Sequence, residues 1–294
     1  PTTMAASTTA VTVSYTEGGV TKTTTTPVTV TSISNTLASN SWATIRAVSD
    51  AGKGSNYWSV GDAKGITING KVGATTISNL AVSVFILGFN HNASREGSNR
   101  IHFQIGKING TLVGLVDGNY GNNTSTTGAF TMNTSNTNSG GWNNSHMRKT
   151  VLGSNSASAT SPTANTLLAA LPADLRAVMK PATKYSDNTG GGSDTASYVT
   201  STTDLLPLLS EFEYHGARSY ANSAEKNYQA QYDYYKAGNS KVHYKHNATG
   251  TAALAWCRSV NSSGYITFCL VHSDGSARNS YAYYSWALAP CFFV

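Results

Sequence analysis

The sequence predicts an α+β protein in which short helices pack on antiparallel strands and long polar loops join them. Segments with alternating apolar and polar residues recur, segments with helical spacing are short, and stretches rich in Gly, Asn, Ser and Thr separate the two. Charged residues make up only 12% of the 294 residues, whereas a disordered chain combines low hydrophobicity with high charge. This composition suits a loop-rich extracellular or virion protein.

The first element is a β-hairpin. Val11, Val13 and Tyr15 alternate with polar residues, Gly18 lies at a turn, and the alternation resumes at Val28. A two-residue or three-residue turn that contains glycine is typical of such hairpins.

Composition divides the chain into three parts. Residues 1–31 hold the hairpin, residues 32–40 form a polar linker, and residues 41–294 form one larger domain. No signal peptide precedes the hairpin, and we interpret Pro1 as a cut within a longer protein.

The larger domain is expected to open with a helix. Trp42, Ile45 and Val48 have helical spacing, and Gly52 can end the helix. Residues 57–62 are then expected to start a strand and a turn.

Two apolar strands follow, at residues 80–89 and 100–105. Residues 118–141 form a Gly/Asn/Thr/Ser loop that is too polar to pack on its own. Within this loop, Phe130 and Met132 are expected to anchor a short element in the core.

Helical patterns occupy the middle of the chain. Residues 142–148 lead into one helix, and residues 167–179 give the clearest helical pattern. Because Pro172 interrupts this pattern, we expect a turn that ends at Leu171 and a helix that starts at Ala173.

The remaining segments are less regular in sequence. Residues 183–203 are expected to form a second polar loop, and residues 205–212 fit a helix or a strand. Residues 220–235 contain five tyrosines and predict a mobile or partly helical excursion. Residues 255–294 read as strands and turns that close the fold.

No catalytic motif is recognisable, so the sequence predicts a protein that is not an enzyme and has no catalytic residue. His243 and His246 are the nearest histidine pair, but no carboxylate or cysteine accompanies them, and we expect no metal site and no cofactor. A structural calcium ion in the polar loops is left open. The odd set of three cysteines, Cys257, Cys269 and Cys291, implies no paired disulfide framework. The sequence favours three unpaired thiols over one bridge with a free thiol.

Charge limits the class of partner. The formal net charge of +6 comes from lysines and arginines that are scattered along the chain. Nucleic-acid binding normally needs a clustered basic face, so we expect no nucleic-acid partner. No apolar run reaches about 18 residues, so we expect no membrane insertion.

The run from Arg278 to Trp286 has an unusual composition. Tyr281 and Tyr283 fit one face of an ordinary strand, but Tyr284 and Trp286 place aromatic residues on the other face too. Tyrosine and tryptophan supply contact area with few rotatable bonds, and Ser and Asn supply adaptable hydrogen bonds, as in antibody binding loops. The run therefore predicts a ligand-facing surface.

Three C-terminal motifs carry a resemblance to a known family. They are W-x-R-S from Trp256, F-x-x-V-x-S-x-G-S from Phe268 and L-A-P-x-F-x-V from Leu288. In this order they resemble the end of the variable proteins of diversity-generating retroelements. The segment G-G-W-N-N-S-x-M-R at residues 140–148 and the Leu-Pro helix also resemble uncharacterised domains of phages and gut bacteria, and the hairpin resembles the last two strands of a bacterial immunoglobulin-like domain.

The resemblance spans residues 41–294 and implies a C-type-lectin-like fold of the formylglycine-generating-enzyme type, with a variable region at residues 256–294. It also implies a fixed hydrophobic frame and a set of displayed positions that vary through adenine-directed mutagenesis. The frame residues are Trp256, Phe268, Val271, Gly275, Ala277, Ala282, Leu288, Pro290, Phe292 and Val294. The displayed, ligand-binding positions are Asn261, Ser262, Tyr265, His272, Arg278, Asn279, Ser280, Tyr281, Tyr283, Tyr284 and Trp286. Trp286 fits least well, because tryptophan cannot arise from such a codon.

The function implied is a receptor-binding or adhesion module that binds a host-cell-surface protein or glycan. It would sit on a phage tail fibre or another virion appendage, beside other virion proteins, or on a bacterial surface. A homo-oligomer is expected, with a trimer as one candidate state. The alternative is a structural virion or cell-surface protein whose C-terminal aromatic strands form a subunit interface.

Overall fold

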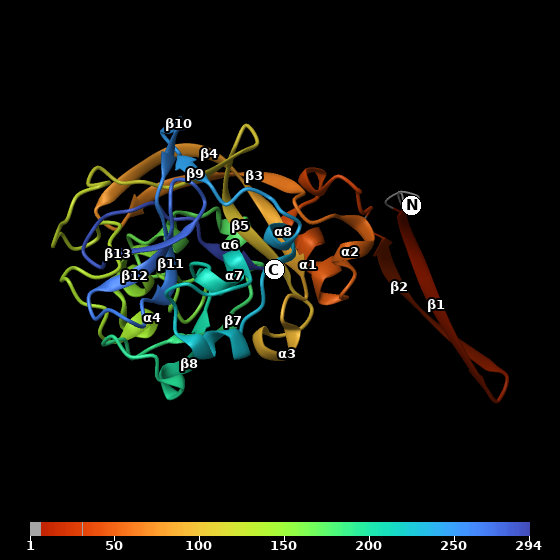
Figure 1. The fold of residues 1–294 in the computed structure, drawn as a ribbon. Helices are drawn as coiled ribbons and strands as arrows, with labels where there is room; N and C mark the ends of the chain where they lie inside the picture. Colours follow the sequence, from red (N-terminus) through yellow and green to blue (C-terminus); the bar gives the residue numbers. More distant parts are fainter. Residues whose placement is uncertain (1–6, 31) are drawn as a thin grey trace.

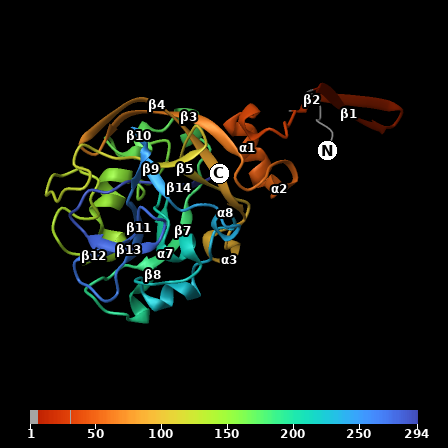
Figure 2. The same cartoon turned by 45° about the horizontal axis from the view of Figure 1, so that its top comes forward.

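A computed structural model describes residues 7–30 and 32–294 and has the α+β architecture expected from the sequence, with many strands and short helices. Figures 1 and 2 show a rounded body and a two-stranded hairpin that stands apart from it. None of the helices described has the length and apolar composition needed to cross a membrane.

The hairpin prediction is confirmed. Strand β1 (Ser7–Glu17) pairs antiparallel with β2 (Val20–Val30), and Glu17 lies opposite Val20. Gly18 and Gly19 both have positive φ, which suits the tight turn between the strands.

The largest sheet forms the scaffold of the body. Its order is β10-β9-β6-β5-β4-β3, and β14 pairs with β5 off this path. All of its pairings are antiparallel except that of β6 with β9. Its strands are β3 (Ala63–Val72), β4 (Thr75–Phe89), β5 (Ile101–Ile108), β6 (Thr111–Gly114), β9 (His243–Lys245), β10 (Ala248–Ala253) and β14 (Cys291–Phe293).

Two smaller antiparallel sheets complete the strands of the body. One is the three-stranded sheet β11-β12-β13 of the C-terminal stretch, and the other is the pair β7-β8. Their bounds are β11 (Ala255–Val260), β12 (Thr267–Val271), β13 (Ala277–Tyr281), β7 (Ala182–Asp187) and β8 (Val199–Asp204).

The helices are short, and α1 and α2 lie at the end of the body nearest the hairpin (Figure 1). The α-helices are α1 (Trp42–Asp50), α2 (Gly54–Tyr57), α3 (Ala93–Glu96), α4 (Gly141–Asn144), α5 (Leu167–Ala170), α6 (Ala173–Arg176), α7 (Glu211–His215) and α8 (Asp233–Lys236). Four more helical segments are η1 (Leu37–Ser39), the π-helix η2 (Met147–Leu152), η3 (Ala196–Tyr198) and η4 (Ser223–Asn227).

Local sequence explains the helix ends that were predicted. Helix α1 starts after Ser41, whose hydroxyl accepts a hydrogen bond from the Thr44 amide at 3.0 Å, and it ends before Gly52, which has a φ of +67°. Pro172 separates α5 from α6, as expected, because proline cannot continue the first helix.

Three expectations for the middle of the chain were wrong. Residues 183–203 are not a polar loop, because most of β7 and β8 falls there. Residues 57–62 do not start a strand: α2 ends at Tyr57 and β3 begins at Ala63. Residues 205–212 are neither a single helix nor a strand; they are irregular until α7 begins at Glu211.

The tyrosine-rich segment 220–235 lies partly in the core. Tyr232, Tyr234 and Tyr235 are buried in a hydrophobic cluster together with Tyr214. The partly helical alternative is confirmed, because η4 and α8 lie in this segment.

The C-terminus closes the fold, as the sequence predicted. Strand β14 pairs with β5, and the Phe292 ring stacks on Phe103 with centroids 5.2 Å apart. Val294 is fully buried. Residues of the expected linker pack on the body: Leu37 belongs to the main core, and the Asn40 carbonyl accepts a hydrogen bond from Lys64 on β3.

Candidate functional site

Five aromatic side chains, four of them from the C-terminal stretch, form one continuous patch that we call the aromatic face. Its members are Tyr120, Tyr281, Tyr283, Tyr284 and Trp286. Tyr284 stacks on Trp286 with ring centroids 5.8 Å apart. The Tyr120 ring packs edge-on against Trp286, with centroids 5.3 Å apart. Tyr281 and Tyr283 contact Tyr284 at 6.0 and 5.5 Å.

The aromatic face is partly open to solvent. Tyr281 is 46% exposed, and Tyr283, Tyr284 and Trp286 are half-buried. Trp286 packs against the main core and donates its indole N–H to the Ser280 hydroxyl at 2.9 Å. The patch is therefore anchored on one side and accessible on the other.

A buried carboxylate fixes the backbone under these rings. Asp117 accepts the Ser285 hydroxyl at 2.6 Å and the Phe130 amide at 2.8 Å. The loop after Asp117 also bonds the C-terminal segment directly: the Gly121 amide donates to the Ser285 carbonyl at 2.9 Å, and the Thr124 amide donates to the Tyr283 carbonyl at 2.8 Å. The Asp117 carboxylate also accepts the Asn119 amide at 3.0 Å, so it forms the turn that leads into this loop as well as positioning the aromatic face.

Three more of the displayed positions lie along β13. Arg278, Asn279 and Ser280 pair with β12, and β13 is an edge strand of its sheet. Arg278 is exposed, while Asn279 and Ser280 are half-buried. Because Tyr281 ends this strand, these residues extend the aromatic face along one edge.

Two displayed positions lie in turns at opposite ends of the β12–β13 hairpin. Tyr265 precedes β12 and is 69% exposed. His272 follows β12 and forms an ion pair with Asp274 at 3.2 Å when protonated. The structure does not bring His272 together with the aromatic face, since Val271 pairs with Ala277 at the far end of β13.

Two of the predicted ligand-binding residues are not displayed on the surface. Asn261 and Ser262 are buried, at 8% and 4% exposure. The Asn261 amide donates to the Thr267 hydroxyl at 2.9 Å, and the Ser262 hydroxyl donates to the Tyr220 carbonyl at 3.1 Å. Their hydrogen bonds shape the turn after β11.

Sequence reasoning missed Tyr120 and Lys245. The Lys245 ammonium lies 4.2 Å from the centre of the Tyr120 ring, a cation–π contact at the edge of the aromatic face. A tyrosine inside the otherwise polar loop 118–141 was the available signal, whereas nothing local in the sequence points to Lys245.

A second group of polar residues lies in the interior. The Lys184 ammonium donates to Glu96 at 2.5 Å, to Glu213 at 2.9 Å and to the Tyr232 hydroxyl at 3.0 Å. Arg258 binds the Glu213 carboxylate through both terminal nitrogens. All five side chains are almost fully buried, and we call them the ion-pair cluster.

Burial and charge set the protonation of this cluster. Burial raises the pKa of Glu96 to about 7, although the nearby Lys184 charge lowers it. Burial also opposes ionisation of Glu213, but the Arg258 and Lys184 charges overcome it and lower the pKa of Glu213. Burial and the nearby Lys184 charge lower the pKa of His91 to about 3, so this ring stays neutral near neutral pH.

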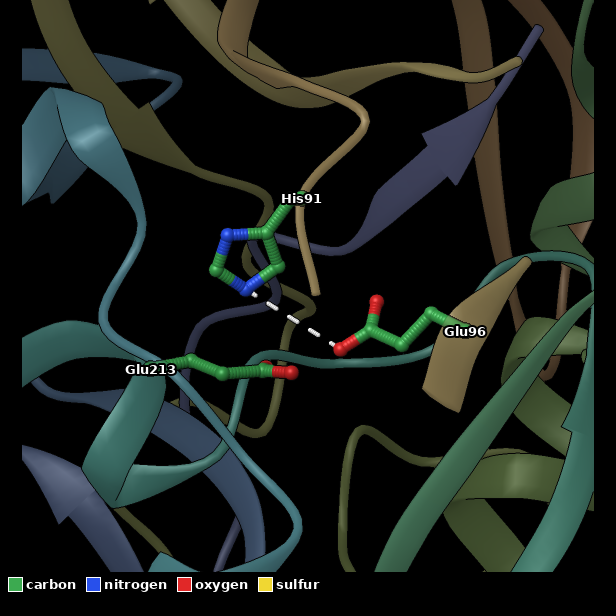
Figure 3. Close-up of side chains that lie close together, drawn as sticks. All are labelled: His91, Glu96 and Glu213. Carbon is green, nitrogen blue, oxygen red and sulfur yellow. Dashed lines mark ion pairs between the residues drawn. The ribbon is translucent and has the colours of Figure 1, made fainter. Parts of the chain in front are cut away.

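Figure 3 shows the part of the interior with metal-ligand residue types. Ligand atoms of His91, Glu96 and Glu213 lie within 4.8 Å of one another, and His91 Nε2 is 3.9 Å from Glu96. Lys184 and Arg258 already balance the charges of the two carboxylates. A divalent cation would add unbalanced positive charge to a closed interior, so this cluster is an ion-pair network that ties elements together.

The three cysteines are free, as predicted, and fully buried. Burial raises the pKa of each thiol well above its usual range. Since the thiolate is the reactive form, these residues lack the properties of redox or nucleophilic cysteines.

A family model described as a domain of unknown function (DUF6273) matches residues 123–294. This is more than half of the chain, so the chain belongs to that family. The matched region starts just after Tyr120 and contains the other four residues of the aromatic face. No curated protein and no solved structure matches the chain.

Proposed function

We propose that this chain is a receptor-binding or adhesion module whose aromatic face binds a protein or glycan on a host-cell surface. We place it on a phage tail fibre or another virion appendage, with a bacterial surface as the other setting. On this proposal the domain has a C-type-lectin-like organisation, and the C-terminal stretch is its displayed region. It acts by binding and not by catalysis.

The observation that carries the proposal is the aromatic face itself. Four neighbouring tyrosines and a tryptophan are held in mutual contact, yet Tyr281 remains 46% exposed. Tyrosine and tryptophan are enriched among the residues that dominate binding energy. Because backbone hydrogen bonds and Asp117 fix the loops beneath, the rings lose little freedom when a ligand binds.

The division into frame and displayed positions gives further support. Seven apolar frame residues have no measurable exposure: Trp256, Phe268, Val271, Ala282, Leu288, Phe292 and Val294. By contrast, Tyr265, Arg278 and Tyr281 are exposed. A surface that varies on a constant interior tolerates many substitutions, because exposed changes usually alter stability by about half a kcal/mol or less.

The test compares matched tyrosine variants. Purified chain, labelled with a fluorophore, is incubated with a panel of bacterial cells, and bound fluorescence is measured for wild type, Tyr281→Ala and Tyr284→Ala. Loss of a hot-spot tyrosine costs about 2 kcal/mol, which corresponds to roughly 30-fold weaker binding. Tyr15→Ala is the control, since Tyr15 is 64% exposed on the hairpin.

Equal binding by Tyr281→Ala and Tyr15→Ala would refute the role of the aromatic face. If Tyr281→Ala instead converts an oligomer to monomers in sedimentation velocity, without effect on cells, the face is a subunit interface.

Diversification of the displayed positions has a separate test in the nucleotide sequence. A near-identical repeat that differs only at adenines, near a reverse-transcriptase gene, is the expected finding. A lone gene without them would refute diversification while leaving binding intact.

A further inference from the structure

A cavity of about 380 Å³ lies beside the aromatic face. It is bounded by the first half of β4, by the segment after β6 and by the turn after β9; its lining includes Thr76, Val116, Gly118 and His246. We propose that this cavity binds one neutral sugar unit of a cell-surface glycan, and that the rest of the glycan extends onto the aromatic face. The inference rests on the proposed binding function and names the class of ligand.

The floor of the cavity is apolar. Ile77 and Val116 are 5% and 4% exposed, and Leu80 is half-buried beside them. A small apolar floor suits the C–H face of a pyranose ring, because small-molecule sites combine apolar surface with a few polar groups that fix orientation.

The rim offers hydrogen-bonding groups that the protein does not use. Within the described part of the chain, no hydrogen bond engages the hydroxyls of Thr75, Thr76 and Ser78 or the amide of Asn247. Hydroxyl groups both donate and accept, and an amide does both through separate atoms. These are the functions needed to recognise the hydroxyl groups of a sugar.

Main-chain groups are also available on this side. Strand β4 pairs with β3 from Thr75 onward. In the part of the chain that the structure describes, β4 pairs with β5 only from Ser83 onward. The first half of β4 therefore has an edge without a strand partner, and its amides and carbonyls can bond a ligand.

His246 adds a donor of defined orientation. Its Nδ1 accepts the Val116 amide at 3.1 Å, so in the neutral ring the proton is on Nε2. Burial lowers the pKa of His246, which keeps the ring neutral near neutral pH. The sequence had offered His246 only as half of a histidine pair; in the structure its partner His243 bonds Tyr214 instead.

The charges of the cavity exclude an acidic sugar. Asp117 is the one charged residue in the lining, and both of its oxygens are engaged. A carboxylate or sulfate on the ligand would meet Asp117 and no cation in this lining, which is unfavourable in a partly desolvated site. A neutral hexose or N-acetylhexosamine has no such conflict.

Asp117 also connects the cavity to the aromatic face. Its carboxylate holds Ser285 beneath the rings, and Tyr120 follows it by three residues. Consecutive Cα atoms are about 3.8 Å apart, so the Tyr120 Cα lies within about 11 Å of the Asp117 Cα. A short oligosaccharide with one unit in the cavity can therefore reach the Tyr120 ring.

The experiment is an NMR titration of the full chain with single sugars. The probes are the methyl glycosides of galactose, glucose, mannose and N-acetylglucosamine, with N-acetylneuraminic acid as the acidic comparison. We expect at least one neutral glycoside to shift the His246 imidazole signals. Ser78→Trp, which fills the cavity, should weaken that binding at least tenfold, and the milder Asn247→Ala should weaken it several-fold.

Ala81→Trp is the matched control, since Ala81 is exposed on the same strand but outside this cavity. It should bind the sugar as wild type does. The inference is overturned if no neutral glycoside binds, if the acidic sugar binds best, or if neither Ser78→Trp nor Asn247→Ala weakens binding in folded protein. If Tyr281→Ala still reduces binding to cells in any of these cases, the proposed function stands without the sugar site.

Discussion

Replacing Arg258 with methionine tests whether the ion-pair cluster holds the C-terminal stretch to the body. Arg258 lies on β11 and is fully buried. Besides its two bonds to Glu213, it donates to the Ser186 hydroxyl and to the Leu208 carbonyl, each at 2.9 Å. Methionine keeps much of the side-chain volume and removes every one of these donors.

The expected loss of stability follows from the groups left behind. Removing one partner of a buried ion pair costs about 3–5 kcal/mol, because the other charge remains buried without its counter-ion. Glu213 would still bond Lys184 and the Ser210 amide at 2.9 Å each, which places the loss at the lower end, about 3 kcal/mol. For a domain of this size, that corresponds to a fall in Tm of roughly 6–12 °C.

The assay is urea unfolding followed by tryptophan fluorescence, with thermal unfolding as a second measure. The control is Arg218→Met, which removes a surface ion pair to Asp194 whose side chains are 36% and 38% exposed. Exposed pairs contribute about 1 kcal/mol or less, so this variant should unfold close to wild type.

A double variant separates charge from packing. Arg258→Met combined with Glu213→Gln removes one charge of each sign and leaves Lys184 paired with Glu96. The double variant should therefore lose less than the sum of the two single losses, by about 1–3 kcal/mol. Additive losses, or an Arg258→Met variant as stable as Arg218→Met, would refute the ion-pair account.

Three further predictions concern the interior. Burial raises the pKa of Glu225 from 4.5 to about 7, so the folded chain keeps a proton that the unfolded chain releases, and the wild type loses stability as pH rises from 4.5 to 7. Between pH 5 and 8, Glu225→Gln should therefore gain up to about 3 kcal/mol in free energy of unfolding relative to wild type. A difference between the two that does not depend on pH would contradict this. The three buried thiols should not react with Ellman's reagent until denaturant is added, and rapid reaction of any of them in the folded chain would show that the interior is open. A Cβ on Gly73 would lie 2.0 Å from the Gly128 carbonyl oxygen, so Gly73→Ala should unfold at a clearly lower urea concentration than Gly110→Ala. Gly110 is the matched control, because its φ is also positive but nothing lies within 4 Å of an added Cβ. Similar unfolding midpoints for the two variants would contradict the close packing.

Periodicity and turn chemistry were enough to predict the elements that depend on local sequence. The hairpin, α1 and the break at Pro172 each follow from side-chain spacing and from residues that cap or interrupt an element. The burial of Phe130 and Met132 was also predictable, because each is a large apolar residue within a polar loop.

Strands β7 and β8 escaped prediction because their buried faces are polar. Lys184 and Asp204 take positions that hydrophobic residues occupy in most strands, and each forms an ion pair with a residue far along the chain. Because strand prediction depends on apolar residues at alternate positions, strands with polar buried faces are predicted as loops. Asn261 and Ser262 show the opposite error. Their polar side chains were predicted to bind a ligand, but they are buried and form hydrogen bonds within the protein.

The sequence by itself determined the mixed α+β class, the closing strands and the composition of the displayed run from Arg278 to Trp286. Only the tertiary structure decided which rings meet, because Tyr120 and Trp286 are joined by the fold and not by spacing along the chain. It also decided that Arg258 belongs to a buried cluster with Glu96, Lys184 and Glu213. Contacts between distant segments depend on the whole packed arrangement, and local periodicity carries no information about them.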